Sequence, residues 1–231
     1  MPQSISKYKL YLYLFFFIFL TSIFNFKFLE NYKNKFSLKE IQITGLPDYE
    51  KKMIEKELNK LQNTNIFKIN KDRVSEILNQ FSFLDKIYVN KAMPSTINLN
   101  LSKTQILGKT FRNGKNFYIG QNGNFIDFDQ LSDNNFNNTV FGNFKIEEFI
   151  NLQKILEKHQ IEINKIKSYY FFKNKRWDLL FSNGLTLKLP TKNLEKSVKI
   201  YNKLLKSDSL HNTKIVDLRV NNQIILTNKN E

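Results

Sequence analysis

The feature that most constrains this chain is an uncharged, aromatic-rich apolar run close to its N-terminus. The run extends from Leu10 to Phe26, and its 17 residues include no Asp, Glu, Lys or Arg. Wound into a helix it would be about 25 Å long, at the short end of what a bilayer requires. Tyr11 and Tyr13 lie near its start, where amphipathic aromatic rings favour a membrane interface. The run therefore predicts a membrane anchor or a secretion signal.

Two interpretations of this run differ in whether it is removed. A cleaved signal peptide also starts with basic residues, but it needs a cleavage site of small residues. The stretch from Thr21 to Phe28 is bulky throughout, which favours an uncleaved anchor. We therefore expect a cytoplasmic tail at 1–9 and a transmembrane helix at 10–28. The remaining residues are expected outside the cytoplasm, because long domains translocate largely regardless of charge.

Composition restricts the chemistry that the rest of the chain can perform. There is no Cys and there are only two His, which excludes a disulfide framework, a cysteine-type zinc site and a thiol nucleophile. The formal net charge of +15 comes with 32 Lys, only four Arg and 31 Asn. Nucleic-acid readers favour Arg for bidentate contacts, so this pattern indicates the codon bias of an AT-rich genome. We expect no nucleic acid, metal or cofactor.

Residues 36–104 show the alternation and spacing of a compact α+β domain. A short strand over 41–43 precedes a helix over 48–61. A second helix follows Asn70, and its apolar residues recur at helical spacing: Val74, Ile77, Leu78 and Phe81. Two further strands are separated at Pro94. The predicted order is strand, helix, helix, strand, strand.

From residue 105 onward the sequence predicts a second, sheet-rich α+β domain. Apolar alternations flank Asn-Gly pairs, a pattern typical of β-hairpins with type I′ turns, at 113–114, 122–123 and 183–184. Two helices interrupt the strands, one near Phe149 and one near Val198. Two late strands are expected, over 216–220 and over 223–227.

No group of residues in the sequence indicates catalysis. The stretch Gly120–Gly123 is a hairpin turn rather than a phosphate loop, because it lacks the Lys-Ser/Thr pair and a following helix. Asp127 and Asp129 are expected on one strand face, where carboxylates are usually solvated. Neither His has neighbours that suggest a triad. Trp177 beside Arg176 could form a recognition pair, but a core position for Trp177 is the better interpretation.

Five short motifs, in order along the chain, carry a resemblance to a known family. They are N-I-F-K-I-N at 65–70, P-S-T-I-N-L at 94–99, K-R-W-D-L at 175–179, L-K-L-P at 187–190 and V-D-L-R at 216–219. With the strand–helix–helix–strand–strand order after an anchor, they resemble a POTRA domain followed by the second domain of the FtsQ/DivIB family, in its alphaproteobacterial form. One departure is S-K-T-Q-I-L-G at 102–108, which replaces the family's E-R-x-P-x-A stretch and leaves the domain junction open.

The resemblance implies an α+β protein with an N-terminal transmembrane helix, a POTRA domain at 36–104 and an FtsQ-type β domain at 105–231. It implies a non-catalytic scaffold in the inner membrane at the division site, with both domains in the periplasm. Members bind FtsB and FtsL, link early division proteins to septal cell-wall synthesis and use the POTRA domain for recruitment. By position, the implied partner-binding residues are Arg176, Val220, Gln223, Ile224, Ile225 and Leu226.

Simple physics supports a binding role for the last predicted strand. Because this strand lies close to the C-terminus, one of its edges can remain unpaired and accept a strand from a partner. The alternative is that the strand is internal or its edge blunted. Two other functions compete: a POTRA-type envelope chaperone or transport component, and a membrane-anchored envelope hydrolase. Envelope chaperones of this type usually have several POTRA units and a barrel, for which 231 residues leave no room. Against a hydrolase, the sequence shows no group of catalytic residues.

Overall fold

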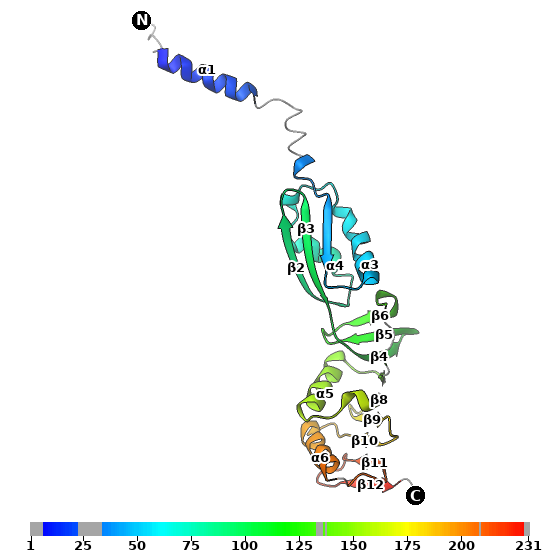
Figure 1. The fold of residues 1–231 in the computed structure, drawn as a ribbon. Helices are drawn as coiled ribbons and strands as arrows, with labels where there is room; N and C mark the ends of the chain where they lie inside the picture. Colours follow the sequence, from blue (N-terminus) through cyan, green and yellow to red (C-terminus); the bar gives the residue numbers. More distant parts are fainter. Residues whose placement is uncertain (1–6, 23–33, 133–135, 137, 208, 229–231) are drawn as a thin grey trace. The chain divides into compact units, whose positions relative to one another are not determined.

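The structure, a computed structural model, describes residues 7–22, 34–132, 136, 138–207 and 209–228 (Figure 1). The chain divides into two compact units. The first comprises the described residues up to Thr44 together with Lys52–Ile77 and Ile87–Asn100. The second comprises Gly45–Lys51, Leu78–Lys86 and the residues from Leu101 onward. Two short segments of the N-terminal half therefore belong to the second unit.

The N-terminal helix α1 spans Lys7–Ser22. Each large apolar side chain from Leu10 to Leu20 has more than half of its surface exposed. Among the helices in the part of the chain that the structure describes, none is long and apolar enough to cross a membrane. The expected span at 10–28 continues into residues 23–33, which lie outside the described residues.

The N-terminal half has the predicted order of elements. These are β1 (Glu40–Thr44), α3 (Asp48–Leu58), η1 (Asn59–Leu61), η2 (Ile66–Lys68), α4 (Lys71–Leu78), β2 (Leu84–Ala92) and β3 (Thr96–Lys103). The three strands form a sheet in the order β1-β3-β2, in which β1 runs parallel to β3. The helix predicted over 48–61 is α-helical only to Leu58 and ends in a 3-10 turn.

Side-chain spacing explains why these residues fold in this way. Fully or almost fully buried residues recur four apart in the helices: Ile54 and Leu58 in α3, Val74 and Leu78 in α4. The Oδ1 atom of Asn70 accepts the backbone N–H of Arg73 at 2.9 Å, which satisfies a free donor at the start of α4. In the sheet, Ile43 and Leu99 are paired in register and both are buried. One face of the sheet therefore belongs to the core.

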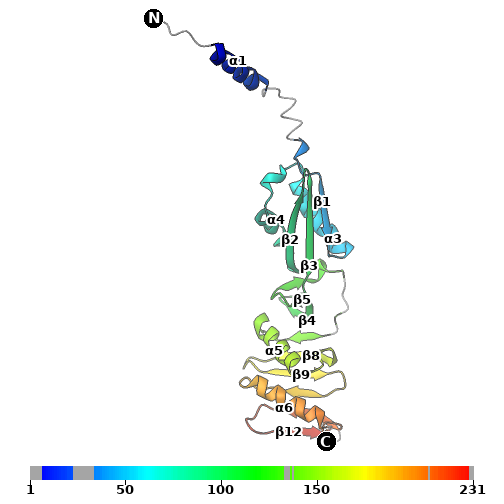
Figure 2. The same ribbon diagram turned by 60° about the vertical axis from the view of Figure 1, so that its left-hand side comes forward.

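The second unit is built on one nine-stranded mixed sheet. Its strands are β4 (Ile106–Arg112), β5 (Lys115–Gly120), β6 (Phe125–Asp127), β7 (Thr139–Phe141), β8 (Ile166–Phe171), β9 (Trp177–Phe181), β10 (Thr186–Lys188), β11 (Thr213–Asp217) and β12 (Ile225–Asn228). The helical elements are η3 (Phe128–Gln130), α5 (Ile146–Lys158), η4 (Ile163–Lys165) and α6 (Leu194–Lys206). The strand order is β12-β11-β10-β9-β8-β7-β4-β5-β6, and α5 and α6 lie on one face (Figures 1 and 2).

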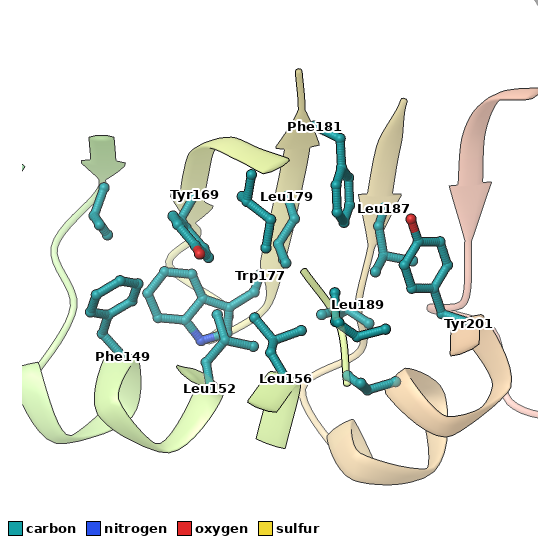
Figure 3. Packing of buried hydrophobic residues seen from close by; sticks show 14 of the residues in the cluster. Phe149, Leu152, Leu156, Tyr169, Trp177, Leu179, Phe181, Leu187, Leu189 and Tyr201 are labelled. Carbon is teal, nitrogen blue, oxygen red and sulfur yellow. The ribbon is translucent and has the colours of Figure 1, made fainter. Parts of the chain in front are cut away.

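The core of this unit lies between the sheet and its two helices (Figure 3). Phe149 of α5 packs against Trp177 of β9, with ring centroids 5.9 Å apart, and edge-on against Tyr169 of β8. Tyr201 of α6 packs against Phe181 of β9 with centroids 5.7 Å apart. Trp177 is only 4% exposed, so the prediction that it belongs to the core is confirmed. Aromatic rings thus fix the distance between helices and sheet.

Only one of the three Asn-Gly pairs forms the predicted type I′ turn. Asn113 and Gly114 both have positive φ, 49° and 79°, and join β4 to β5. At the other two pairs only the glycine has positive φ, so those turns are of another type. The reason is visible at Asn122, whose side-chain amide donates to the carbonyls of Ser82 and Leu84, both at 3.0 Å. Tertiary hydrogen bonds select the conformation of this turn.

Candidate partner-binding edge

The candidate functional site is formed by β12, the terminal strand of the nine-stranded sheet. β12 pairs antiparallel with β11, with Asp217 opposite Ile225 and Val216 opposite Leu226. Its other edge has no neighbouring strand among the described residues. A strand with one unpaired edge presents a row of backbone donors and acceptors, which can pair with an extended segment of another chain.

The strand begins later than the sequence predicts. Gln223 and Ile224 precede β12 instead of belonging to it, and the predicted strand over 216–220 ends at Asp217. The N–H of Gln223 donates to the carbonyl of Val220 at 3.2 Å, which closes a turn. The alternation of apolar residues therefore extends to Val220, past Asp217, which is the last residue of β11 and pairs with β12.

Four apolar side chains at this edge are exposed. The exposed fractions are 46% for Val220, 48% for Ile224, 45% for Ile225 and 41% for Leu226. A single exposed apolar residue needs no explanation, but four within the short stretch 220–226 indicate a segment that can bind a partner. Five of the six predicted site residues, Val220 and 223–226, are thus brought together here.

The sixth predicted residue, Arg176, immediately precedes strand β9 of the same sheet. It lines a hollow of about 260 Å³ together with Arg219 and Val220. Its guanidinium stacks on Phe172, 4.2 Å from the ring centroid, and not on the neighbouring Trp177. Arg176 therefore shares a hollow with Val220, while its guanidinium is held by an aromatic ring.

Two acidic residues of the sheet, Asp217 in β11 and Asp178 in β9, have opposite electrostatic environments. The Arg219 Nε donates to both carboxylate oxygens of Asp217, at 2.8 and 2.9 Å, and these hydrogen bonds lower the pKa of Asp217. Burial raises the pKa of Asp178, against the opposing charge of Arg176, whose Nε lies 3.8 Å from Oδ1. Asp217 is thus stabilised as an ion, whereas the ionised form of Asp178 is penalised.

A larger hollow of about 590 Å³ adjoins the edge at the start of α6. Lys192, Lys196 and Arg219 contribute to its lining, beside Ile224, and no Asp or Glu is among the described residues that line it. Lys196 Nζ lies 3.3 Å from Oδ1 of Asn222, which has a positive φ of 59°. Sequence reasoning missed this hollow, because Lys192 and Lys196 are far from the last strand in the sequence and only the fold brings them together.

Residues considered for chemistry are separated in the structure. Asp127 ends β6, whereas Asp129 lies in η3, so the expectation that they share a strand face is wrong. His159 terminates α5, and its Nε2 lies 3.5 Å from the exposed Glu195. Within the described ranges, no three His, Asp or Glu side chains are grouped so that they could hold a metal ion.

Comparisons with known proteins agree with the order of the two folded regions. The family pattern "POTRA domain, FtsQ-type" matches residues 36–103, and "Cell division protein FtsQ/DivIB, C-terminal" matches residues 111–219. The Cell division protein FtsQ of Rickettsia bellii (strain RML369-C) is 29% identical over 195 residues, which cover 81% of this chain and 71% of the relative. That of Rickettsia prowazekii (strain Madrid E) is 26% identical over 190 residues with the same coverage. The two patterns together cover most of the chain, and the chain therefore belongs to the FtsQ/DivIB family of cell division proteins.

Proposed function

We propose that this chain is a non-catalytic scaffold of the division machinery, which binds FtsB- and FtsL-like proteins and links early division proteins to septal cell-wall synthesis. The observation that carries the proposal is the unpaired edge of β12, with exposed apolar side chains at Val220 and 224–226. An FtsB-like segment would add to β12 as a further strand, with backbone hydrogen bonds supplying affinity and alternate side chains supplying specificity.

The residues around β12 fit a partner with acidic and apolar side chains. Arg176, Lys192 and Lys196 line two hollows next to the segment that precedes β12, which gives this surface positive charge and room for side chains of a partner. Apolar side chains of an added strand would cover Ile225 and Leu226 on opposite faces of the sheet. We infer that the POTRA domain recruits other division proteins, as the family resemblance implies.

A single membrane span is part of this proposal. The uncharged run continues from α1 to Phe26, beyond the last described residue of that helix. The apolar side chains of α1 are exposed, as those of a helix in contact with lipid would be. We place residues 1–9 in the cytoplasm and the folded units in the periplasm, at the division site.

A pair of proline substitutions tests strand addition. Backbone N–H groups of successive strand residues point to opposite edges, so those of Ile225 and Leu226 point one toward β11 and one toward the unpaired edge. Proline removes this donor. We expect one of Ile225→Pro and Leu226→Pro to weaken binding of a synthetic FtsB-like periplasmic segment sharply while the melting temperature stays near wild type. The other proline should mainly lower the melting temperature.

Binding is measured by calorimetry on the full-length protein in detergent, and folding is followed by circular dichroism. The two variants are controls for each other, because they lose donors that point to opposite edges, and Ile225→Ala and Leu226→Ala control for the lost side chains. If both proline proteins remain folded and bind the segment as tightly as wild type, strand addition at β12 is wrong.

A further inference from the structure

A continuous row of residues crosses the outer face of the nine-stranded sheet, opposite α5 and α6. Strand pairing places Phe141 of β7 beside Tyr170 of β8, and Tyr170 beside Asp178 of β9. Phe111, one residue beyond the paired positions of β4 and β7, adds a third aromatic ring. On the other side the row continues through Lys188, Asp217 and Ile225. One half of the row is therefore aromatic, and the other half holds three charged residues and Ile225.

The aromatic half is exposed although the residue before each of its rings is buried. Phe111, Phe141 and Tyr170 are 63%, 45% and 36% exposed, whereas the residue before each of them points into the core. The rings of Phe141 and Tyr170 stack on each other, with centroids 5.1 Å apart. Three adjacent strands thus present large aromatic surfaces to solvent, which in soluble domains marks an interaction site.

The dimensions of the aromatic half fit a helix. The two described helices that pack on this sheet cover the opposite face, so a helix on the outer face would complete a three-layer arrangement. β4, β7 and β8 span two strand spacings, roughly 10 Å. Residues i and i+7 of a helix are about 10.5 Å apart along its axis. Apolar side chains at i, i+3 or i+4, and i+7 would therefore meet the three rings.

Charge at the strand ends that follow Phe141 and Tyr170 indicates the kind of helix, in a hollow that also includes the start of α5. A hollow of about 610 Å³ at the ends of β7 and β8 is lined by Lys145, Lys173 and Lys175, with Phe172. One carboxylate, that of Glu148, also lines it and accepts the backbone N–H of Lys145 at 2.9 Å, so the hollow holds three lysines against one glutamate. This basic hollow complements carboxylates. A second copy of the chain, with its formal net charge of +15, would bring like charges together.

We propose that Phe111, Phe141 and Tyr170 form a second interaction surface, which binds an acidic amphipathic helix of a partner protein. The apolar face of the helix covers the three rings, and its carboxylates enter the hollow lined by Lys145, Lys173 and Lys175. This surface is separate from the β12 edge, so the two can be occupied independently.

The proposal is tested with a synthetic helical peptide of about 15 residues, with Leu at i, i+4 and i+7 and Glu at the flanking positions. A peptide with the same Leu pattern and Lys in place of Glu is the matched control. We expect full-length protein to bind the acidic peptide, with affinity that falls as salt is raised. Phe141→Ser with Tyr170→Ser, and separately Lys173→Glu with Lys175→Glu, should each weaken binding about tenfold or more.

Two further readouts separate this surface from other possibilities. Ile225→Pro and Leu226→Pro, as long as the protein is folded, should leave peptide binding unchanged, and Tyr88→Ser on the other sheet serves as an exposed-aromatic control. A photoreactive amino acid at Phe111 in living cells should crosslink to an acidic amphipathic segment of another protein. Equal binding of the two peptides, no effect of the Phe141 and Tyr170 substitutions, or crosslinks only to lipid, glycan or a second copy would overturn the proposal.

Discussion

At the scale of single residues, two aspartates on the same sheet face respond to pH with opposite sign. Asp217 has a lowered pKa in the folded state, so its contribution to stability is present above the ordinary aspartate pKa and is lost as pH falls through the lowered value. Asp178 has a raised pKa, so the cost of its ionised form is present at neutral pH and disappears as pH falls below the ordinary value.

We therefore expect Asp217→Asn to be less stable than wild type at pH 7 and Asp178→Asn to be at least as stable as wild type. Both differences should shrink as the pH approaches about 3, below the ordinary aspartate pKa. Urea midpoints measured from pH 7 to pH 3 check this. Equal destabilisation by the two substitutions at pH 7 would show that Asp178 is stabilised as an ion.

At the scale of elements, the end of β7 depends on a glycine that leaves no room for a side chain. Gly142 has a φ of 104°, and a β-carbon built on it would lie 2.1 Å from the carbonyl oxygen of Phe171. Gly123 also has positive φ, 85°, but a β-carbon there would meet nothing within 4 Å. Both positions require a backbone conformation that favours glycine, but only at Gly142 would a side chain clash with the backbone of Phe171.

Gly123→Ala is expected to cost about 1–2 kcal/mol of unfolding free energy, from the left-handed backbone alone. Gly142→Ala should cost more, because the backbone of β8 must also move. Denaturant unfolding of the two single variants measures the difference. Equal losses of unfolding free energy for the two variants would mean that the ends of β7 and β8 can move apart at no cost in free energy.

Local sequence patterns predicted the helices and strands well, but they did not predict which strands lie next to each other. The strand–helix–helix–strand–strand order followed from apolar spacing, and the core position of Trp177 followed from the usual place of a lone tryptophan. The end of β11 was missed because Leu218 donates its N–H to Lys188, outside the ladder with β12. The row from Phe111 to Ile225 was not predictable, because β4 pairs with β7 across a long connection and alternation gives faces but not strand order.

At the scale of the whole molecule, the proposed anchor determines where the protein is found. A charged residue at the centre of a membrane helix costs about 2.5–3.5 kcal/mol on insertion scales. We expect the wild-type protein to remain in membranes after alkaline carbonate extraction, whereas Leu14→Lys with Phe17→Lys should weaken this retention. The apolar exchange Leu14→Phe with Phe17→Leu is the matched control and should behave as wild type.

The intact mass of the purified protein provides the second readout. It should include the N-terminal apolar run, since the bulky stretch from Thr21 to Phe28 offers no small-residue cleavage site. A mature protein that lacks about the first 25 residues would identify the run as a signal peptide and refute the anchor.

The unpaired edge of β12 also affects how readily the protein aggregates. An apolar edge that can accept a partner strand can equally template the edge of another copy, which is the first step of sheet-like aggregation. The formal net charge of +15 opposes this encounter over roughly a Debye length, about 8 Å at physiological ionic strength. The lysines spread along the chain would thus keep this edge from pairing with another copy before the proposed partner binds it. High salt screens this repulsion, and synthesis of the chain in excess of the proposed partner leaves the edge uncovered, so both would favour self-association.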